Sequence, residues 1–240
     1  MNLVIDVGNS FQKIGLFNPN GELVFVNSFP KLESEYVSAL IKNNHISHAI
    51  ISEVGLMDPN IPQILEENTN LIPFTKDLKL PIQISYVTPE SLGKDRIANS
   101  VAAHHLFPNQ NCLSIQAGTC IVYDFIDQNG TFLGGAIAPG IQMRFNALHD
   151  QTARLPLLQK SAIDYFLGKD TQQSIKSGVI NGVVFEIEGQ IMSYIAEFKE
   201  VTVLLTGGDM GYLQKSIKNQ IFATPNLVMV GLNKILNLNV

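Results

Sequence analysis

The sequence predicts an α/β protein made of two related domains. Short apolar strands alternate with helical segments in both halves of the 240 residues, and glycine turns end several of the strands. One strand–turn–strand pattern also occurs twice, as NLVIDVGNSFQKIGLF from Asn2 and CLSIQAGTCIVYDFID from Cys112. Such a repeat indicates two copies of one fold. We therefore expect domains at 1–108 and 109–240 that face a central cleft.

The predicted elements follow from apolar periodicity and from the turn residues between them. In the first half we predict strands at 3–7, 12–18, 21–29, 48–54 and 70–75, and helices at 33–44, 58–68 and 93–107. The last helix should bury one face that carries Ile97, Val101 and Leu106. In the second half we predict strands at 112–118, 120–127, 130–138 and 201–209, and helices at 171–198 and 226–236.

Composition and charge exclude several classes of protein. A net charge of −5 gives no basic surface for nucleic acid, and 45% apolar residues favour a compact globular chain. No apolar stretch approaches the roughly 20 residues that span a bilayer, and no signal peptide is evident. The two cysteines, Cys112 and Cys120, suit a reducing compartment as ordinary apolar residues. We expect a cytoplasmic protein without nucleic-acid or membrane partners.

The first repeated turn, DVGNS, has the chemistry of a phosphate site. Glycine lets a ligand approach the backbone closely, and successive turn N–H groups can form an anion-binding concavity. Ser10 adds a hydroxyl donor, Lys13 adds positive charge, and Asp6 suits a hydrated magnesium ion. The Walker pattern is absent, so this turn is a hairpin and not a strand-to-helix loop. A plain structural hairpin is the alternative.

Two further glycine-rich stretches, GGAIAPG at 134–140 and TGGD at 206–209, also follow strands. Each alone is compatible with a structural turn. Three glycine turns at strand ends of two facing domains are what a nucleotide cleft requires.

A charged pair, Asp95 and Arg96, lies at the predicted start of a helix, where backbone N–H groups favour an anion. Arg96 can hold a carboxylate through two hydrogen bonds, and Asp95 can accept a proton from an attacking hydroxyl. The alternative is a helix cap with a solvated arginine. The five histidines have no metal-ligand spacing, and no nucleophile elbow is present.

With these motifs in order, the chain resembles the type III pantothenate kinases, within the superfamily of sugar kinases, acetate kinase and actin. The resemblance rests on DVGNSFQKIGLF, YVTPESLGKDRIAN, GTCIVYDFID, GGAIAPG, LHDQTARLP, GKDTQQSIKSG and LTGGD. It implies two ribonuclease H-like, actin-like ATPase domains and ATP-dependent phosphorylation of pantothenate, the first step toward coenzyme A. A nucleotide-binding regulatory homologue without catalysis, or a kinase for another small hydroxylated acid, remains as an alternative.

The resemblance also implies residue roles. Asp95 would be the general base and Asp6 a magnesium ligand. The ATP phosphates would be held by Asp6, Val7, Gly8, Asn9, Ser10, Phe11, Gln12, Lys13 and Thr119, and pantothenate by Tyr86, Gly93, Lys94, Asp95, Arg96 and Thr171. Thr171 would act within a homodimer. Independently, the repeat of Ser174, Gly178 and Gly182 every four residues allows close helix contact, either between subunits or within the chain.

Gln116 departs from the family pattern, in which an aspartate at this position is assigned to a bound potassium or ammonium ion. The glutamine carbonyl can still coordinate a cation, but it brings no charge. Three outcomes are open: the cation still binds, activity persists without it, or the protein binds nucleotide and catalyses poorly.

Overall fold

The computed structural model describes all residues from 1 to 240, and the chain forms two compact units. Unit 1 comprises Met1–Pro108, Asn129–Leu133 and Asn226–Val240; unit 2 comprises Asn109–Gln128 and Gly134–Pro225. The predicted extent of the second domain is therefore wrong for 129–133 and 226–240, which belong to unit 1.

Unit 1 is built on a five-stranded sheet in the order β3-β2-β1-β4-β5. The central strand β1 pairs antiparallel with β2 and parallel with β4. The strands are β1 (Asn2–Val7), β2 (Gln12–Phe17), β3 (Leu23–Phe29), β4 (His48–Glu53) and β5 (Asn70–Ile72). All five were predicted, because their apolar runs are bounded by turn residues.

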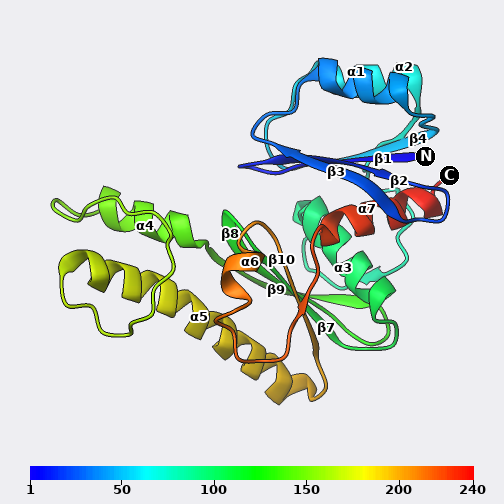
Figure 1. The fold of residues 1–240 in the computed structure, drawn as a ribbon. Coiled ribbons are helices and arrows are strands. Elements are labelled where there is room, and N and C mark those ends of the chain that lie inside the picture. The colour runs from blue at the N-terminus through cyan, green and yellow to red at the C-terminus, as the bar shows by residue number, and fades with distance from the viewer. The chain divides into compact units, whose positions relative to one another are not determined.

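Helices cover both faces of this sheet (Figure 1). On one face, α1 (Ser34–Asn43) and α2 (Asn60–Asn68) pack against a core that includes Leu3, Ile5 and Val7. On the other face lie α3 (Lys94–Leu106) and α7 (Leu227–Leu238). Side chains alternate along a strand, so Asp6 points to the α3 side of the sheet.

The C-terminal helix α7 belongs to unit 1 because it packs closely on α3. A Cβ atom on Gly231 would lie 1.8 Å from the backbone oxygen of Ala98, so only glycine permits this approach. This packing also buries α3 almost all round from Arg96 to Ala103, whereas Leu106 is 41% exposed. The predicted one-sided burial of α3 is therefore wrong.

The segment 129–133 adds a short ladder to unit 1. β6 (Gln83–Ile84) pairs in parallel with Thr131 and Phe132, which begin β9 (Thr131–Pro139). Gln83 N–H donates to the Gly130 carbonyl at 2.8 Å, and Ser85 N–H donates to that of Phe132 at 2.9 Å. A short 3₁₀ helix, η1 (Pro89–Ser91), leads from there to α3.

Unit 2 repeats the sheet of unit 1. Its strands run in the order β11-β10-β7-β8-β9, which matches β5-β4-β1-β2-β3. The bounds are β7 (Cys112–Ala117), β8 (Cys120–Ile126), β10 (Thr202–Thr206) and β11 (Phe222–Ala223), with β9 from Gly134 onward. The repeat inferred from the two hairpins is therefore present in the fold.

The helices of unit 2 are α4 (Ile141–Asp150), α5 (Thr171–Phe198) and α6 (Met210–Leu213). α5 has the predicted bounds and packs Ile187 and Ile191 into the core of the unit. In Figure 1, α4 and the first half of α5 extend beyond the edge of the sheet. No helix of the chain combines the length and hydropathy that crossing a membrane requires.

Candidate active site

The turn between β1 and β2 is held rigidly by the turn that follows β4. Gly8 N–H donates to the Phe11 carbonyl at 3.1 Å, and both Val54 and Gly55 donate to the Val7 carbonyl, at 2.9 and 3.0 Å. A Cβ atom on Gly55 would lie 2.3 Å from the Gly8 oxygen, so the two turns touch backbone to backbone. The exposed side chains on this turn are Asn9, Ser10 and Phe11.

Asp6 lies beside this turn between two register partners, Lys13 on β2 and Ser52 on β4. Burial, together with the charge of Asp95, raises the pKa of Asp6 to about 7, while Lys13 and the Ser52 hydroxyl act in the opposite direction. The Lys13 ammonium also donates to Asn226 Oδ1 at 3.3 Å. The fold thus brings together Asp6 and Asp95, which are far apart in the sequence.

Asp95 occupies the first turn of α3, after Gly93 as the N-cap residue. Burial raises the pKa of this carboxyl, and the backbone N–H groups of Arg96 and Asp95 partly offset that rise. A Cβ atom on Gly93 would lie 2.6 Å from Asp95 Oδ1, so glycine leaves the space that this carboxylate fills. Gly93 therefore determines where the Asp95 carboxylate sits.

Replacing Gly93 with alanine should displace the Asp95 carboxylate, because the new methyl group would occupy its position. If Asp95 has the general-base role expected from the sequence, kcat should fall by about tenfold to a hundredfold, with little change in the melting temperature. Steady-state kinetics and thermal unfolding measure both. An unchanged kcat would show that the carboxylate position does not matter. Gly211→Ala is the matched control, because Gly211 lies on open helix surface where an added methyl group meets no other atom. Gly21→Ala would not serve, because Gly21 has a positive φ of 81° and alanine would strain the backbone there.

Arg96 is buried beside a pair of adjoining aromatic rings, so the alternative of a solvated arginine is wrong. Its side chain is only 7% exposed, and its guanidinium carbon lies 5.7 Å from the ring centre of Tyr86 and 5.6 Å from that of Phe132. The two ring centres lie only 5.9 Å apart, so both rings meet the guanidinium from one side and hold it through cation–π contacts. Phe132 comes from the 129–133 segment and was not predicted.

Lys94 lies on a different part of unit 1. Its ammonium lies 5.9 Å from the ring centre of Phe74. It also lines a cavity of about 240 Å³ whose other walls include Ile51, Glu53 and Met57. Among the predicted pantothenate residues, Tyr86 and Arg96 contact each other, and Lys94 has this separate aromatic partner.

Two predicted phosphate residues have their side chains inside unit 1. Val7 is fully buried in the core. Gln12 is 4% exposed; its Nε2 donates to the Leu56 carbonyl at 2.6 Å, and its Oε1 accepts from Leu32 N–H at 2.8 Å. The Gln12 side chain therefore holds the loops around the first hairpin.

In unit 2, the other two glycine-rich stretches pack against the second hairpin turn. Gly140 N–H donates to the Thr119 carbonyl, and Asp209 N–H donates to that of Ala117, each at 3.0 Å. Gly207 has a φ of 95°, and a Cβ atom there would lie 2.2 Å from the Ala117 oxygen. The turn beside Gln116 is thus enclosed by GGAIAPG and TGGD.

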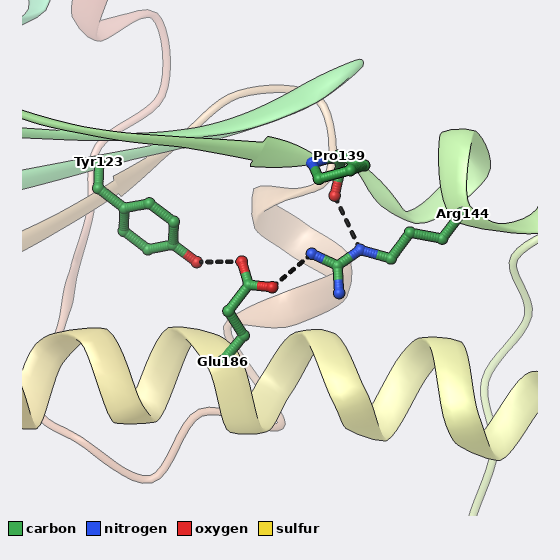
Figure 2. A network of polar contacts seen from close by, with 4 residues as sticks. All are labelled: Tyr123, Pro139, Arg144 and Glu186. Atoms are coloured by element: carbon green, nitrogen blue, oxygen red, sulfur yellow. Dashed lines mark hydrogen bonds and ion pairs between the residues drawn. The ribbon is translucent and has the colours of Figure 1, made fainter. Parts of the chain in front are cut away.

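A polar network that the sequence did not reveal anchors α4 in this unit (Figure 2). Arg144 donates through Nε to the Pro139 carbonyl at 2.9 Å and through Nη2 to Glu186 at 2.6 Å. The Tyr123 hydroxyl donates to the same carboxylate at 3.0 Å, and burial raises the pKa of that phenol. Because these residues are widely separated in the chain, local sequence patterns gave no signal.

Asp209, at the end of TGGD, is 7% exposed and forms an ion pair with Lys160. Thr171 is the exposed first residue of α5, directly after Asp170, whose side chain accepts from Gln173 N–H at 2.8 Å.

The donor set around Asp6 fits magnesium. No group of three or more His, Cys, Asp or Glu side chains is arranged to hold a metal ion. Magnesium usually binds through one or two carboxylates plus substrate phosphates and keeps several waters. Asp6, with Asp95 near enough to raise its pKa, offers the carboxylate oxygens that such a site would use.

Comparisons with known proteins agree with these features. The family model for type III pantothenate kinase matches residues 2–193. The chain is 40% identical over 247 residues to a type III pantothenate kinase of Christiangramia forsetii, covering 100% of this chain and 99% of that protein. It is 42% identical over 240 residues to one of Cytophaga hutchinsonii, covering 100% of both.

Solved structures show the same fold at low identity. An inorganic polyphosphate/ATP-glucomannokinase from an Arthrobacter strain matches with a TM-score of 0.53 at 12% identity, covering 99% of this chain and 98% of that one. A glucokinase from an Antarctic psychrotroph matches with a TM-score of 0.51 at 11% identity, covering 98% of both. The fold is that of the sugar kinases, and the chain belongs to the type III pantothenate kinase family.

Proposed function

We propose that this protein transfers the γ-phosphoryl group of ATP to the primary hydroxyl of pantothenate, giving 4′-phosphopantothenate and ADP. This reaction begins coenzyme A biosynthesis, and we place it in the cytoplasm, where Cys112 and Cys120 remain separate thiols. The observation that carries the proposal is the grouping of Asp6 and Asp95 in unit 1, with Arg96 one residue further along the same helix. The retained carboxylates favour an active enzyme over a regulatory homologue.

Asp95 acts as the general base. It accepts the hydroxyl proton of pantothenate while that oxygen forms a bond to the γ-phosphorus and the bond from phosphorus to the β–γ bridging oxygen breaks. Its raised pKa brings it closer to the operating pH, which suits a proton acceptor. Because phosphoryl transfer needs little covalent help, positioning and charge stabilisation supply most of the rate enhancement.

Arg96 holds the pantothenate carboxylate. The adjoining rings of Tyr86 and Phe132 hold the guanidinium in place through cation–π contacts before the substrate arrives. A planar guanidinium binds a carboxylate through two parallel hydrogen bonds. This arrangement would select for a hydroxylated acid and orient its hydroxyl relative to Asp95.

The first hairpin binds the ATP phosphates. The N–H groups of the turn between Gly8 and Phe11 and the Ser10 hydroxyl donate to phosphate oxygens, and Lys13 supplies positive charge. Asp6 would hold the magnesium ion, which neutralises developing charge on the phosphates.

Gln116 would hold a potassium or ammonium ion through its carbonyl oxygen, more weakly than an aspartate would. Charge count tunes the affinity of oxygen ligands for a cation. The neighbouring Thr206 on β10 is in register with Gln116 and places a second oxygen-bearing side chain beside it.

The proposal is tested by measuring ADP release with ATP, magnesium and pantothenate, in potassium and in sodium buffers. Other small hydroxylated acids serve as competing substrates. Turnover with pantothenate supports the proposal, and a higher rate in potassium supports the cation site at Gln116. Nucleotide binding without turnover of any acid would favour the regulatory alternative, and turnover of another acid alone would reassign the substrate.

We also propose a homodimer formed through one exposed stripe of α5. The stripe comprises Ser174, Gly178, Gly182, Phe185, Gly189 and Met192. Phe185 and Met192 are each 56% exposed, and a Cβ atom on any of the three glycines would meet nothing within 4 Å. Phe166 and Leu167, 72% and 74% exposed, extend the apolar surface, with the Phe166 ring centre 6.2 Å from that of Phe185.

A second copy of the chain fits this stripe because glycines spaced by four residues let two helices approach closely. Large exposed apolar patches on a globular protein commonly mark an interface. In the dimer, Thr171 of the partner subunit would complete the substrate site, so assembly and activity should be lost together.

Gly178→Arg should prevent dimerisation, because the long charged side chain would fill the space that a second helix needs. We expect a monomer by light scattering coupled to size exclusion, with kcat/KM reduced by at least tenfold. Helix propensity rises on replacing glycine with arginine, so the variant should remain folded. Gln190→Arg, off the stripe on the same helix, is the matched control. A dimeric, fully active Gly178→Arg would contradict the proposal.

A further inference from the structure

Ser52 lies beside Asp6 in the centre of the unit 1 sheet. The two residues are register partners on the parallel strands β1 and β4, so their side chains leave the sheet on the same face. Ser52 is fully buried. Its hydroxyl lies close enough to the Asp6 carboxylate to lower the pKa of that group.

The Ser52 hydroxyl has no hydrogen-bond partner of ordinary geometry in the structure. A buried polar group without a partner is costly, so native proteins rarely retain one without a reason. Alanine would fill nearly the same volume without that cost. The hydroxyl is therefore better explained by a hydrogen bond to the neighbouring Asp6 carboxylate that reaches full geometry when the site is loaded.

The internal repeat places a hydroxyl at the equivalent position of unit 2. There, Thr206 on β10 is the parallel register partner of Gln116 on β7 and is 4% exposed. Asp6 and Gln116 are themselves equivalent in the two hairpins. Each unit thus sets a buried hydroxyl next to the residue for which we propose cation binding.

We propose that Ser52 is a positioning residue for the divalent cation that accompanies ATP. Its hydroxyl donates a hydrogen bond to the Asp6 carboxylate and fixes the orientation in which Asp6 meets the cation. Hydrogen bonds to metal-binding carboxylates orient them, and their loss typically weakens metal binding by about 10- to 100-fold. This inference rests on the proposed placement of the cation at Asp6.

The test measures Mn²⁺ binding to the full chain by electron paramagnetic resonance, with a saturating non-hydrolysable ATP analogue. Ser52→Ala should weaken Mn²⁺ binding about tenfold and raise the Mg²⁺ concentration for half-maximal rate by a similar factor. The KM for pantothenate should stay unchanged. Ser52→Thr keeps the hydroxyl, with the residue found at the equivalent place in unit 2, and should bind Mn²⁺ like the wild type.

Two further variants separate the possible failures. Ser34→Ala removes another buried serine hydroxyl of unit 1 away from Asp6 and should change nothing in cation binding. If Asp6→Asn loses Mn²⁺ binding but Ser52→Ala binds as tightly as the wild type, the role of Ser52 is overturned while the proposed function stands. If Asp6→Asn still binds Mn²⁺ normally, the placement of the cation fails, and the role of Ser52 fails with it.

Discussion

Asp95→Asn is expected to lower kcat by about 10³-fold while pantothenate still binds with nearly the affinity of the wild type. A positioned general base contributes about 10²- to 10⁴-fold, and asparagine keeps the shape of the side chain without accepting the proton. Because burial raises the pKa of Asp95, the acid limb of the wild-type pH profile should lie above the ordinary aspartate range. Activity should rise with pH through that limb, as the carboxylate loses its proton.

Steady-state kinetics measure kcat, and calorimetric titration with pantothenate measures binding separately. Asp77→Asn, the same change at an exposed site of unit 1, is the matched control and should leave both quantities unchanged. A variant with Asp95→Asn that retains most of its kcat would remove Asp95 from the chemistry. A variant that loses pantothenate binding but not kcat would make Asp95 a binding residue.

Asp6→Asn is expected to make the nucleotide-free protein more stable and the enzyme nearly inactive. The pKa of Asp6 is raised from 3.8 to about 7, so the folded protein holds a proton that the unfolded chain releases at lower pH. Ionising Asp6 in the folded protein therefore lowers the free energy of unfolding. This loss is absent below about pH 4, where the carboxyl is protonated in both states, and is complete above about pH 7, where it is ionised in both. At pH 8 the variant should gain up to about 4 kcal/mol in its free energy of unfolding, since one pKa unit corresponds to about 1.4 kcal/mol.

Urea unfolding at pH 4 and pH 8 measures this difference. Asp58→Asn is a control for which we expect the opposite change in stability. Hydrogen bonds from the backbone of Asn60 and from Ser34 lower the pKa of Asp58, so its ionised form stabilises the fold. That variant should be less stable than the wild type at neutral pH. A loss of stability at pH 8 for Asp6→Asn would mean that Asp6 serves the fold more than the site.

Local features of the fold were predictable from the sequence, because they depend on nearby residues. The hairpins and the repeat follow from alternating apolar runs and glycine turns, and α5 from its sustained helical pattern. α7 was assigned to the wrong domain because its partner, Ala98, lies far away in the chain and only the close approach at Gly231 shows the pairing. The two-residue strands β6 and β11 are too short to produce any periodicity.

The candidate site was predictable where a motif carried it. Asp6, Asp95 and Arg96 were found from turns and a helix start, but nothing local indicated that Phe132 would stack on Arg96. The structural contacts of Gln12 gave no local signal, because its side-chain amide bonds to loops at Leu32 and Leu56 that are distant in the chain. A serine within a strand gives no signal alone, so Ser52 emerged only from the register with Asp6.

The most direct test of the account is ³¹P nuclear magnetic resonance of the protein with ATP, magnesium and pantothenate. We expect a new phosphomonoester resonance that couples to the methylene protons of the primary alcohol and grows as ADP appears. Asp95→Asn should show none on the same time scale. Release of inorganic phosphate alone, or ATP that stays intact in the presence of potassium, would contradict a site in which Asp6 and Asp95 direct phosphoryl transfer to pantothenate.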